Sequence, residues 1–203
     1  MQFLDSKTIK LDRILSELDM FVSDFLKILE KHTDYVIVSG YVAILFGRSR
    51  TTEDVDILIP HMRREQFSEF FDDVMKNGLW FLNSSKMDDL YEILSSKSGI
   101  RISKEGDIDP NFEIKFVKNP VDEAALKNRL KVNMDGCSLY IGPLELQIVY
   151  KEKVLRSFKD KEDARHLRIV FKGHLSEELF EHYRRLIYED ENKGRFKGSS
   201  PAE

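Results

Sequence analysis

The alternation of hydrophobic and polar positions predicts helices and strands in turn along the chain. Across residues 7–31, apolar side chains recur at spacings of four and three residues, which predicts an amphipathic helix whose inner face holds Leu11, Leu15, Leu18, Val22, Phe25 and Leu29. The β-branched run at 35–38 predicts a buried strand, and residues 41–46 predict a helix that Gly47 ends. The apolar run at 55–59, followed by Pro60, predicts a second strand.

The pattern continues through the rest of the chain. Residues 112–117 alternate cleanly, with Phe112, Ile114 and Phe116 on one side and Glu113 and Lys115 on the other, which predicts a half-buried strand. Further extended segments are predicted at 79–82, 99–103, 131–134 and 138–141. Helices are predicted at 61–76, 87–94 and 120–130, and over most of a helical C-terminal third at 144–188.

These elements predict an α/β (α+β) fold in which helices flank a small mixed β-sheet. We expect residues 1–142, including the N-terminal helix, to form the core. Residues 143–190 are expected to form a helical C-terminal segment that packs on this core. The polar residues 191–203, rich in glycine and serine towards their end, are expected to be a disordered tail.

Composition restricts where such a protein works. With 203 residues, 41% of them hydrophobic, the chain can bury one sizeable core. Its single cysteine, Cys137, excludes an internal disulfide, and the chain shows neither a signal peptide nor an apolar run long enough to span a bilayer. We therefore expect a cytoplasmic protein without membrane insertion. The net charge of −4 means that any nucleic-acid partner must bind a local patch.

The tripeptide Asp54-Val55-Asp56 is the first candidate for chemistry. On a strand, both carboxylates point to the same face, close enough to share one divalent cation. Two like charges at the entrance of a hydrophobic strand repel each other unless they have a partner, and Mg²⁺ is a natural one. The tripeptide alone is weak evidence, because Asp107-Ile108-Asp109 repeats it in a predicted turn. A solvated strand entrance is the alternative interpretation.

The pair Ser39-Gly40 is the second candidate, because it joins a predicted buried strand to a helix. Unpaired N–H groups and the positive end of the helix dipole can bind an anion there, and glycine lets the backbone approach a phosphate closely. A plain tight turn would carry the same residues.

Taken together, residues 38–58 have a strand, a Ser-Gly turn, a helix and then Arg50-x-Thr52-x-Asp54-x-Asp56 entering the next strand. This order resembles the signature of the nucleotidyltransferase-fold (polymerase-beta-like) superfamily, and within it the branch of AbiEii-type toxins and related bacterial and archaeal proteins. Ser39 stands where that family usually has its first glycine. The resemblance extends to about residue 167, with Lys151 and the pattern Lys159-Asp160-x-x-Asp163 similar to the branch's C-terminal helices.

The resemblance implies a role for each matching residue. It implies Mg²⁺ or Mn²⁺ held by three residues that are also catalytic: Asp54, Asp56 and Glu113. It implies that the nucleotide is contacted by Ser39, Gly40, Arg50, Thr52, Lys115 and Lys151. On the face that it shares with Glu113, Lys115 either contacts a phosphate or partly neutralises the acidic site in place of a second metal. Asp160 and Asp163 are interpreted as structural partners of nearby basic groups.

The activity implied is transfer of a nucleoside monophosphate from an NTP such as ATP to a hydroxyl acceptor, with release of pyrophosphate. The acceptor would be an RNA or tRNA end, a protein, or a small molecule, and a toxin role would bring an antitoxin partner. Two alternatives stay open. One is a non-catalytic nucleotide- or RNA-binding protein of the same fold, and the other is a purely structural domain. The oligomeric state is left open as well.

Overall fold

The computed structural model describes residues 1–52 and 54–196, with side chains as far as Asn192. Its strands form one mixed nine-stranded sheet in the order β1-β2-β8-β9-β3-β4-β7-β6-β5. Pairing is parallel between β2 and β8, between β9 and β3 and between β4 and β7, and antiparallel elsewhere. The strands are β1 Gln2–Asp5, β2 Thr8–Lys10, β3 Val36–Val38, β4 Asp54–Ile59, β5 Leu79–Phe81, β6 Ile100–Lys104, β7 Asn111–Phe116, β8 Leu130–Met134 and β9 Cys137–Ile141.

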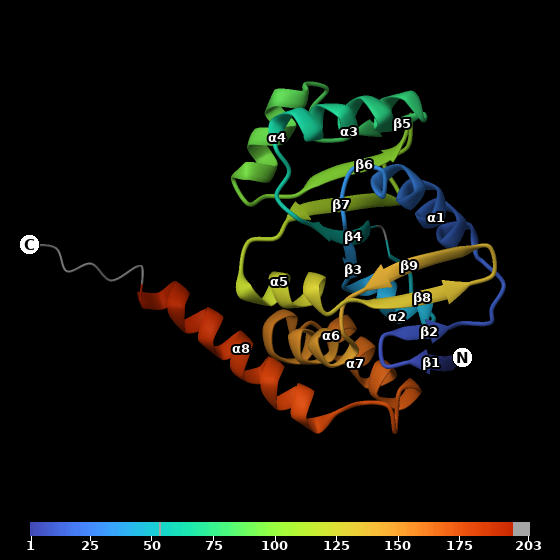
Figure 1. Cartoon of the computed structure of the whole chain (residues 1–203), viewed down its shortest axis with the longest axis vertical. Helices are drawn as coiled ribbons and strands as arrows, with labels where there is room; N and C mark the ends of the chain where they lie inside the picture. Colours follow the sequence, from blue (N-terminus) through green and yellow to red (C-terminus); the bar gives the residue numbers. More distant parts are fainter. Residues whose placement is uncertain (53, 197–203) are drawn as a thin grey trace, which may run out of the picture.

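Helices surround this sheet, as Figure 1 shows. They are α1 Glu17–Leu29, α2 Gly40–Leu45, α3 Arg64–Lys76, α4 Met87–Ser95, α5 Pro120–Lys127, α6 Leu144–Tyr150, the π-helical turn η1 Lys151–Leu155, α7 Phe158–Val170 and α8 Glu177–Phe196. In Figure 1, α3 and α4 lie at the top beside β5 and β6, whereas α5, α6 and α7 lie below β7. The mixed α/β fold with a helical C-terminal segment is therefore confirmed.

Two faces of the central strands have different roles. On β7, the ring of Phe112 stacks on Phe21 and Phe25 of α1, with centroids 4.5 and 4.0 Å apart. Glu113 comes next on β7 and therefore faces the other way. Helix α1 therefore packs on the face of β7 that holds Phe112, which leaves the opposite face for Glu113 and Lys115.

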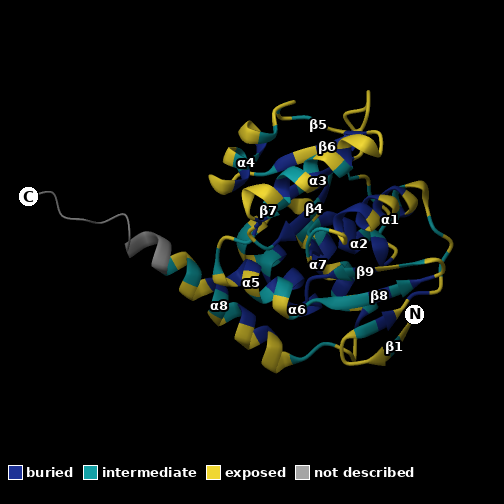
Figure 2. Cartoon of the chain, turned by 45° about the horizontal axis from the view of Figure 1, so that its top comes forward, coloured by how far each residue is buried: buried dark blue, intermediate teal, exposed yellow. Residues whose placement is uncertain are grey.

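One hydrophobic cluster runs through the whole described part of the chain, from Ile9 to Ile187. Figure 2 shows buried residues gathered in the centre of the molecule and exposed residues on the outer sides of the helices. Helix α7 packs on α2, and α8 packs on α5 and α6, so the C-terminal helices share the core of the sheet.

The predicted N-terminal helix is wrong for residues 7–16. Residues 2–10 instead form the hairpin β1–β2, and β2 pairs in parallel with β8. Ile9 is fully buried in this pairing, opposite Val132. Helix α1 begins only after Ser16, whose side chain caps it in a reciprocal capping box with Asp19. The prediction started the helix too early because Leu11 and Leu15 fit the helical spacing, although the capping residue, Ser16, follows both of them.

The predicted disordered tail is wrong for residues 191–196, because α8 continues to Phe196. Phe180, Tyr183 and Ile187 are buried and anchor this helix on the core, so its later turns extend from a fixed base. Residues 197–203 lie outside the described part of the chain. In the part that is described, no helix combines the length and the apolar character needed to cross a membrane.

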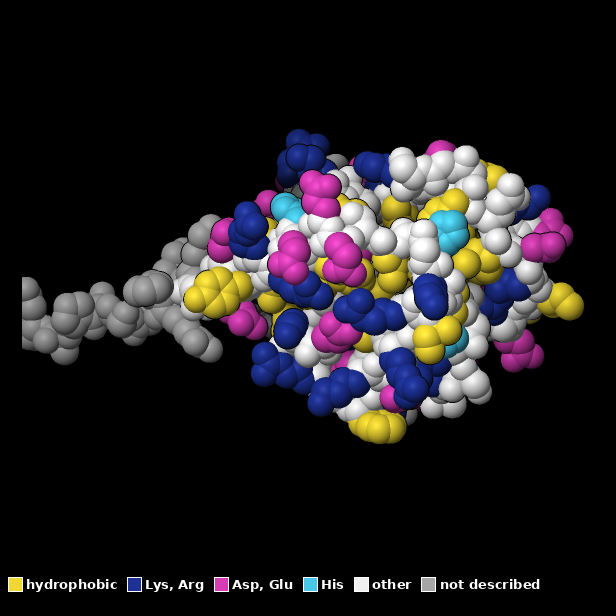
Figure 3. Space-filling view, turned by 90° about the horizontal axis from the view of Figure 1, so that it is seen from below, with side chains coloured by type: hydrophobic (Ala, Val, Ile, Leu, Met, Phe, Trp, Pro, Cys, Tyr) yellow, Lys and Arg dark blue, Asp and Glu magenta, His cyan; other side chains and the backbone are white. Residues whose placement is uncertain are grey.

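The face seen from below in Figure 3 carries Lys and Arg side chains interleaved with Asp and Glu. Such a mixture solvates the surface without creating a field of one sign.

Candidate active site

The turn between β3 and α2 is held in an unusual backbone conformation. Ser39 has φ 68° and ψ −134°, a region that glycine adopts readily and that costs other residues roughly 1–3 kcal/mol. Its N–H donates to Oε1 of Gln147 at 3.1 Å, which ties the turn to α6. A buried amide of the C-terminal segment therefore engages this N–H.

Gly40 lies against the guanidinium of Arg50. A Cβ atom on Gly40 would lie 3.1 Å from Nη2 and 3.2 Å from Cζ of Arg50. The absence of a side chain therefore lets the guanidinium reach the backbone at the start of α2. Because the start of a helix is already positive, a cation there favours an anion as a third partner.

The acidic residues meet on neighbouring strands. Asp54 and Asp56 are two positions apart on β4, and Asp56 is paired in register with Glu113 on β7. All three therefore share the face away from α1. The Thr52 hydroxyl donates to the Asp54 backbone oxygen at 2.8 Å and lies 3.4 Å from the Asp54 carboxylate, so it fixes the loop that enters β4.

Lys115 joins two of these carboxylates. Its Nζ atom lies 2.5 Å from Oε2 of Glu113 and 3.3 Å from Oδ1 of Asp56. Gly99 makes room for the pair, because a Cβ there would lie 3.0 Å from Glu113 Oε1 and 3.1 Å from Lys115 Cε. The lysine therefore occupies the place where a cation would bridge β4 and β7.

The proton affinities in this group diverge. Burial raises the pKa of Asp56 to about 6, although the charge of Lys115 opposes the rise. Burial would also raise the pKa of Glu113, but the hydrogen bond and charge of Lys115 outweigh it and hold that pKa below its usual value. Burial alone would lower the pKa of Lys115, whereas its two carboxylate partners raise it. Lys115 and Glu113 are therefore both charged at neutral pH.

A basic cluster lies on the other side of the turn, around the fully buried Asp163 of α7. Arg50 Nη1 donates to Asp163 at 2.5 Å, and Lys151 Nζ donates at 2.8 Å. Arg48 forms a third ion pair, 2.6 Å from Nε to Oδ1. Asp160 lies 3.5 Å from Lys151 and also forms the capping box of α7 with Ser157, the N-cap residue. The interpretation of Asp160 and Asp163 as partners of basic groups is confirmed.

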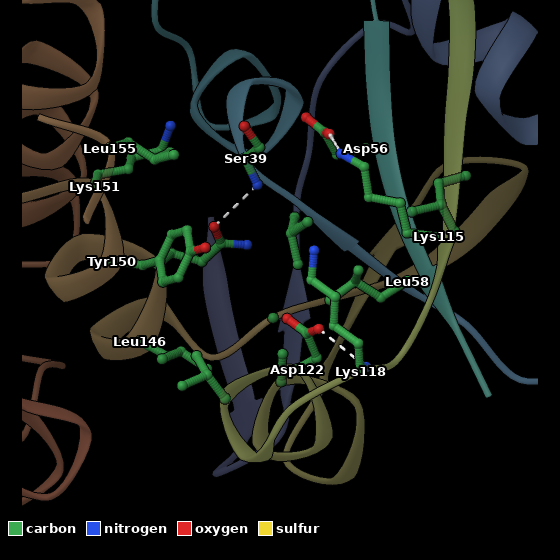
Figure 4. Close-up of a pocket in the computed structure, with 16 residues that line it drawn as sticks. Ser39, Asp56, Leu58, Lys115, Lys118, Asp122, Leu146, Tyr150, Lys151 and Leu155 are labelled. Carbon is green, nitrogen blue, oxygen red and sulfur yellow. Dashed lines mark hydrogen bonds and ion pairs between the residues drawn. The ribbon is translucent and has the colours of Figure 1, made fainter. Parts of the chain in front are cut away.

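A cavity of about 180 Å³ lies between the two clusters. Figure 4 shows Asp56 and Lys115 on one wall and Tyr150, Lys151 and Leu155 on the opposite wall, with Ser39 between them. Asp122 and Lys118 lie at the far end from Ser39 in the same view. Gln147 and Gly142 also line the cavity, together with six apolar side chains: Val38, Ile57, Leu58, Val121, Ala125 and Leu146.

The cavity therefore brings together four of the predicted residues, namely Ser39, Asp56, Lys115 and Lys151. The other five do not line the cavity but lie next to residues that do. Gly40 follows Ser39 and contacts Arg50, Thr52 and Asp54 lie at the start of β4, and Glu113 contacts Lys115. In residues 1–52 and 54–196, no three His, Cys, Asp or Glu side chains are arranged to hold one metal ion. Within this group, Lys115 is the cation that pairs with Glu113 and Asp56.

Sequence reasoning missed several residues of the site, chiefly Arg48, Gln147 and Tyr150. Gln147 and Tyr150 lie in the helix that follows Gly142-Pro143, and their three-residue spacing places them on one face. That spacing could have indicated that both residues face the site. No local pattern could have identified Arg48, because its partner Asp163 is more than a hundred positions away.

The chain was compared with known protein families and solved structures. Residues 17–195 match the family described as nucleotidyl transferase of unknown function (DUF2204). The crystal structure of an antigenic nucleotidyltransferase-like protein from Paracoccidioides brasiliensis is similar, with a TM-score of 0.49 and 17% sequence identity, and the match covers 89% of this chain and 93% of that chain. No curated protein matches the chain. With 17–195 matched, the chain belongs to this family of nucleotidyl transferases of unknown function.

Proposed function

We propose that the chain transfers a nucleoside monophosphate from an NTP to a hydroxyl acceptor and releases pyrophosphate, with Mg²⁺ or Mn²⁺ as cofactor. The observation that carries this proposal is that Asp56 of β4 and Ser39 of the β3–α2 turn line the same cavity. A metal-binding carboxylate and a phosphate-binding turn have to be neighbours in such an enzyme, because the metal links protein carboxylates to phosphate oxygens.

Asp54 and Asp56 suit the cation in their chemistry. Mg²⁺ is bound in proteins through one or two carboxylates together with substrate phosphates and water. Both side chains are partly exposed on one strand face, so they can be reached by a hydrated ion. Bound there, Mg²⁺ would neutralise phosphate charge and help to orient the α-phosphorus.

Arg50 and Lys151 are proposed to hold the triphosphate. Asp163 takes one N–H group of Arg50, and the Thr51 carbonyl accepts from Nε at 3.2 Å, so the guanidinium retains further donors. Lys151 lines the cavity and is fixed by Asp163 and Asp160. Both cations are thus oriented before the ligand arrives, which lowers the entropic cost of binding.

In the proposed reaction the acceptor oxygen forms a bond to the α-phosphorus. The bond from that phosphorus to the bridging oxygen of pyrophosphate breaks, and its electron pair leaves with pyrophosphate. The proton of the acceptor hydroxyl passes to a carboxylate, for which we propose Glu113. The lowered pKa keeps Glu113 ionised and able to accept the proton at neutral pH, although it also makes the residue a weak base.

For the acceptor we propose an RNA or tRNA end or a protein hydroxyl, as the resemblance to AbiEii-type toxins implies, with an antitoxin as the corresponding partner. A second candidate function is nucleotide or RNA binding without catalysis. The ion pairs of Lys115 with Asp56 and Glu113 favour it, because they compete with a metal for the same carboxylates.

Two measurements on the same samples distinguish these functions. Nucleotide binding would be followed by calorimetry with each of the four NTPs and Mg²⁺, and pyrophosphate release would be followed with a total cell extract as acceptor. The enzyme binds an NTP and releases pyrophosphate, and Asp56→Ala loses the release. A non-catalytic binder retains binding and gives no release from the wild type. If all four NTPs fail to bind at millimolar concentration, the enzyme and the nucleotide-binding alternative are both wrong, and only RNA binding is left of the second candidate.

A further inference from the structure

Lys115 has a second role that rests on the proposed function and concerns the number of metal ions. Nucleotide polymerisation sites commonly use two divalent ions about 3.5–4 Å apart, held by shared carboxylates. In this chain the Lys115 ammonium already links two of the three candidate carboxylates, 2.5 Å from Glu113 and 3.3 Å from Asp56. A metal ligated by these same two oxygens, Oε2 of Glu113 and Oδ1 of Asp56, would have to displace it, since a ligated Mg²⁺ sits about 2.0–2.1 Å from each oxygen.

The lysine is held in this position by its surroundings. Only 29% of its side chain is exposed, and the partner side chains of Asp56 and Glu113 are 19% and 20% exposed. Gly99 of the segment before β6 closes against both Glu113 and Lys115, with no space for an additional side chain. Arg101 lies opposite Glu113 in the β6–β7 register, which adds a second positive charge near that carboxylate.

Charge balance leads to the same conclusion. The three carboxylates of Asp54, Asp56 and Glu113 together with the ammonium of Lys115 leave two net negative charges. One divalent cation neutralises them, whereas two divalent cations would leave a positive excess before the phosphates bind. A metal that binds Asp54 does not have to compete with Lys115, because the Asp54 carboxylate contacts the Thr52 hydroxyl and not the lysine.

We propose that the ammonium of Lys115 takes the place of one of the two divalent cations, so that this chain binds a single Mg²⁺ or Mn²⁺, at Asp54 and Asp56. In this arrangement Glu113 is not a metal ligand. It holds the lysine in place, and the lysine supplies a fixed positive charge on the side of the site where the acceptor hydroxyl would lose its proton.

The test counts Mn²⁺ ions per chain, a readout that does not depend on activity. Equilibrium dialysis gives the number bound, and electron paramagnetic resonance shows whether bound ions are spin-coupled, as ions about 4 Å apart are. Both are measured with Mn²⁺ alone and with Mn²⁺ plus the α,β-methylene analogues of the four NTPs. We expect one uncoupled Mn²⁺ in the wild type and two coupled ions in Lys115→Met. Lys131→Met, a strand lysine of β8 away from the site, should behave as the wild type.

The wild-type count decides the matter even if Lys115→Met does not fold. Two coupled ions in the wild type overturn the proposal and leave the proposed function standing, and so does a folded Lys115→Met that still binds one ion. A single ion in the wild type that is lost in Asp54→Asn supports the proposal, even when no nucleotide analogue binds and the proposed function therefore fails. No bound ion under any condition overturns both.

Discussion

The guanidinium of Arg50 donates a hydrogen bond to the buried carboxylate of Asp163, 113 positions later in the chain. Arg50 belongs to the loop that enters β4, and Asp163 belongs to α7. Lys151 and Arg48 bind the same carboxylate. One aspartate therefore connects the turn, the loop and the C-terminal helices, and it orients the cations that we propose for phosphate binding.

Replacing Asp163 with alanine should lower the free energy of unfolding by about 3–5 kcal/mol, because it leaves the nearly inaccessible Lys151 ammonium without its nearest counter-charge. Chemical denaturation measures this. Glu162→Ala is the matched control: its carboxylate lies 3.9 Å from Arg48 and 4.0 Å from Arg165 and is partly exposed, so the loss should stay below about 1 kcal/mol. Equal losses in the two variants would show that Asp163 is not the connecting residue.

Ser39→Gly should stabilise the chain by roughly 1 kcal/mol. The backbone strain at φ 68° is relieved, while the greater freedom of glycine in the unfolded chain offsets part of the gain. The measurement is the denaturation midpoint, with Ser49→Gly as the control. Ser49 is an exposed loop serine outside the left-handed region, and glycine there should be neutral or destabilising. A loss of stability in Ser39→Gly would mean that the Ser39 side chain contributes more than its backbone costs.

Gly40→Ala should push the Arg50 guanidinium away from the start of α2, because the new Cβ would lie 3.1 Å from Nη2 of a group that Asp163 holds in place. We expect a loss of about 1–3 kcal/mol in stability and weaker NTP binding. In a double-mutant cycle with Arg50→Ala, the stability loss caused by alanine at position 40 should largely disappear. Additive losses would contradict the contact.

Asp56→Asn should change the pH dependence of stability. The pKa of Asp56 is raised to about 6 by burial, so the folded chain keeps this proton to higher pH than the unfolded chain does. The ionised Asp56 therefore destabilises the fold as pH rises from about 4 through 6. Without divalent ions, Asp56→Asn should be more stable than the wild type at pH 7.5 by about 2 kcal/mol, and the difference should shrink at pH 4.5.

The control for this pH effect is Asp24→Asn, on the exposed side of α1, whose difference from the wild type should stay within about 0.5 kcal/mol at both pH values. A constant stability difference between Asp56→Asn and the wild type across the pH range would rule out a raised pKa at Asp56.

Local sequence patterns predicted most of the helices and strands and part of the candidate site. The alternation in residues 112–117 predicted that Glu113 and Lys115 share a face, and the β4–β7 register puts Asp56 beside them. The family resemblance implied that Lys115 either contacts a phosphate or neutralises the acidic site. The local pattern alone could not predict its contact with Asp56, because that contact depends on the pairing of β4 with β7, which are distant in sequence. The same holds for Arg48 and Gln147, whose partners are distant in sequence.

The N-terminal hairpin shows a different limit. A helical spacing from Leu11 onward was real, but it continued through residues that end up in an irregular segment before Ser16. Residues 8–10 form a strand by pairing with β1 on one side and with β8 on the other, where Ile9 lies opposite Val132. Tertiary pairing overrode the local preference, as is common for short β-strands.

The most direct test of the central claim is the fate of each phosphate of the NTP. The chain is incubated with Mg²⁺ and NTPs labelled at the α- or the γ-phosphate, and with a total cell extract that is then separated into RNA, protein and small molecules. The account predicts that the α-label becomes attached to one fraction, that the γ-label appears in pyrophosphate, and that Asp56→Ala abolishes both. Transfer of the γ-label, or no transfer of the α-label from any of the four NTPs, would contradict it.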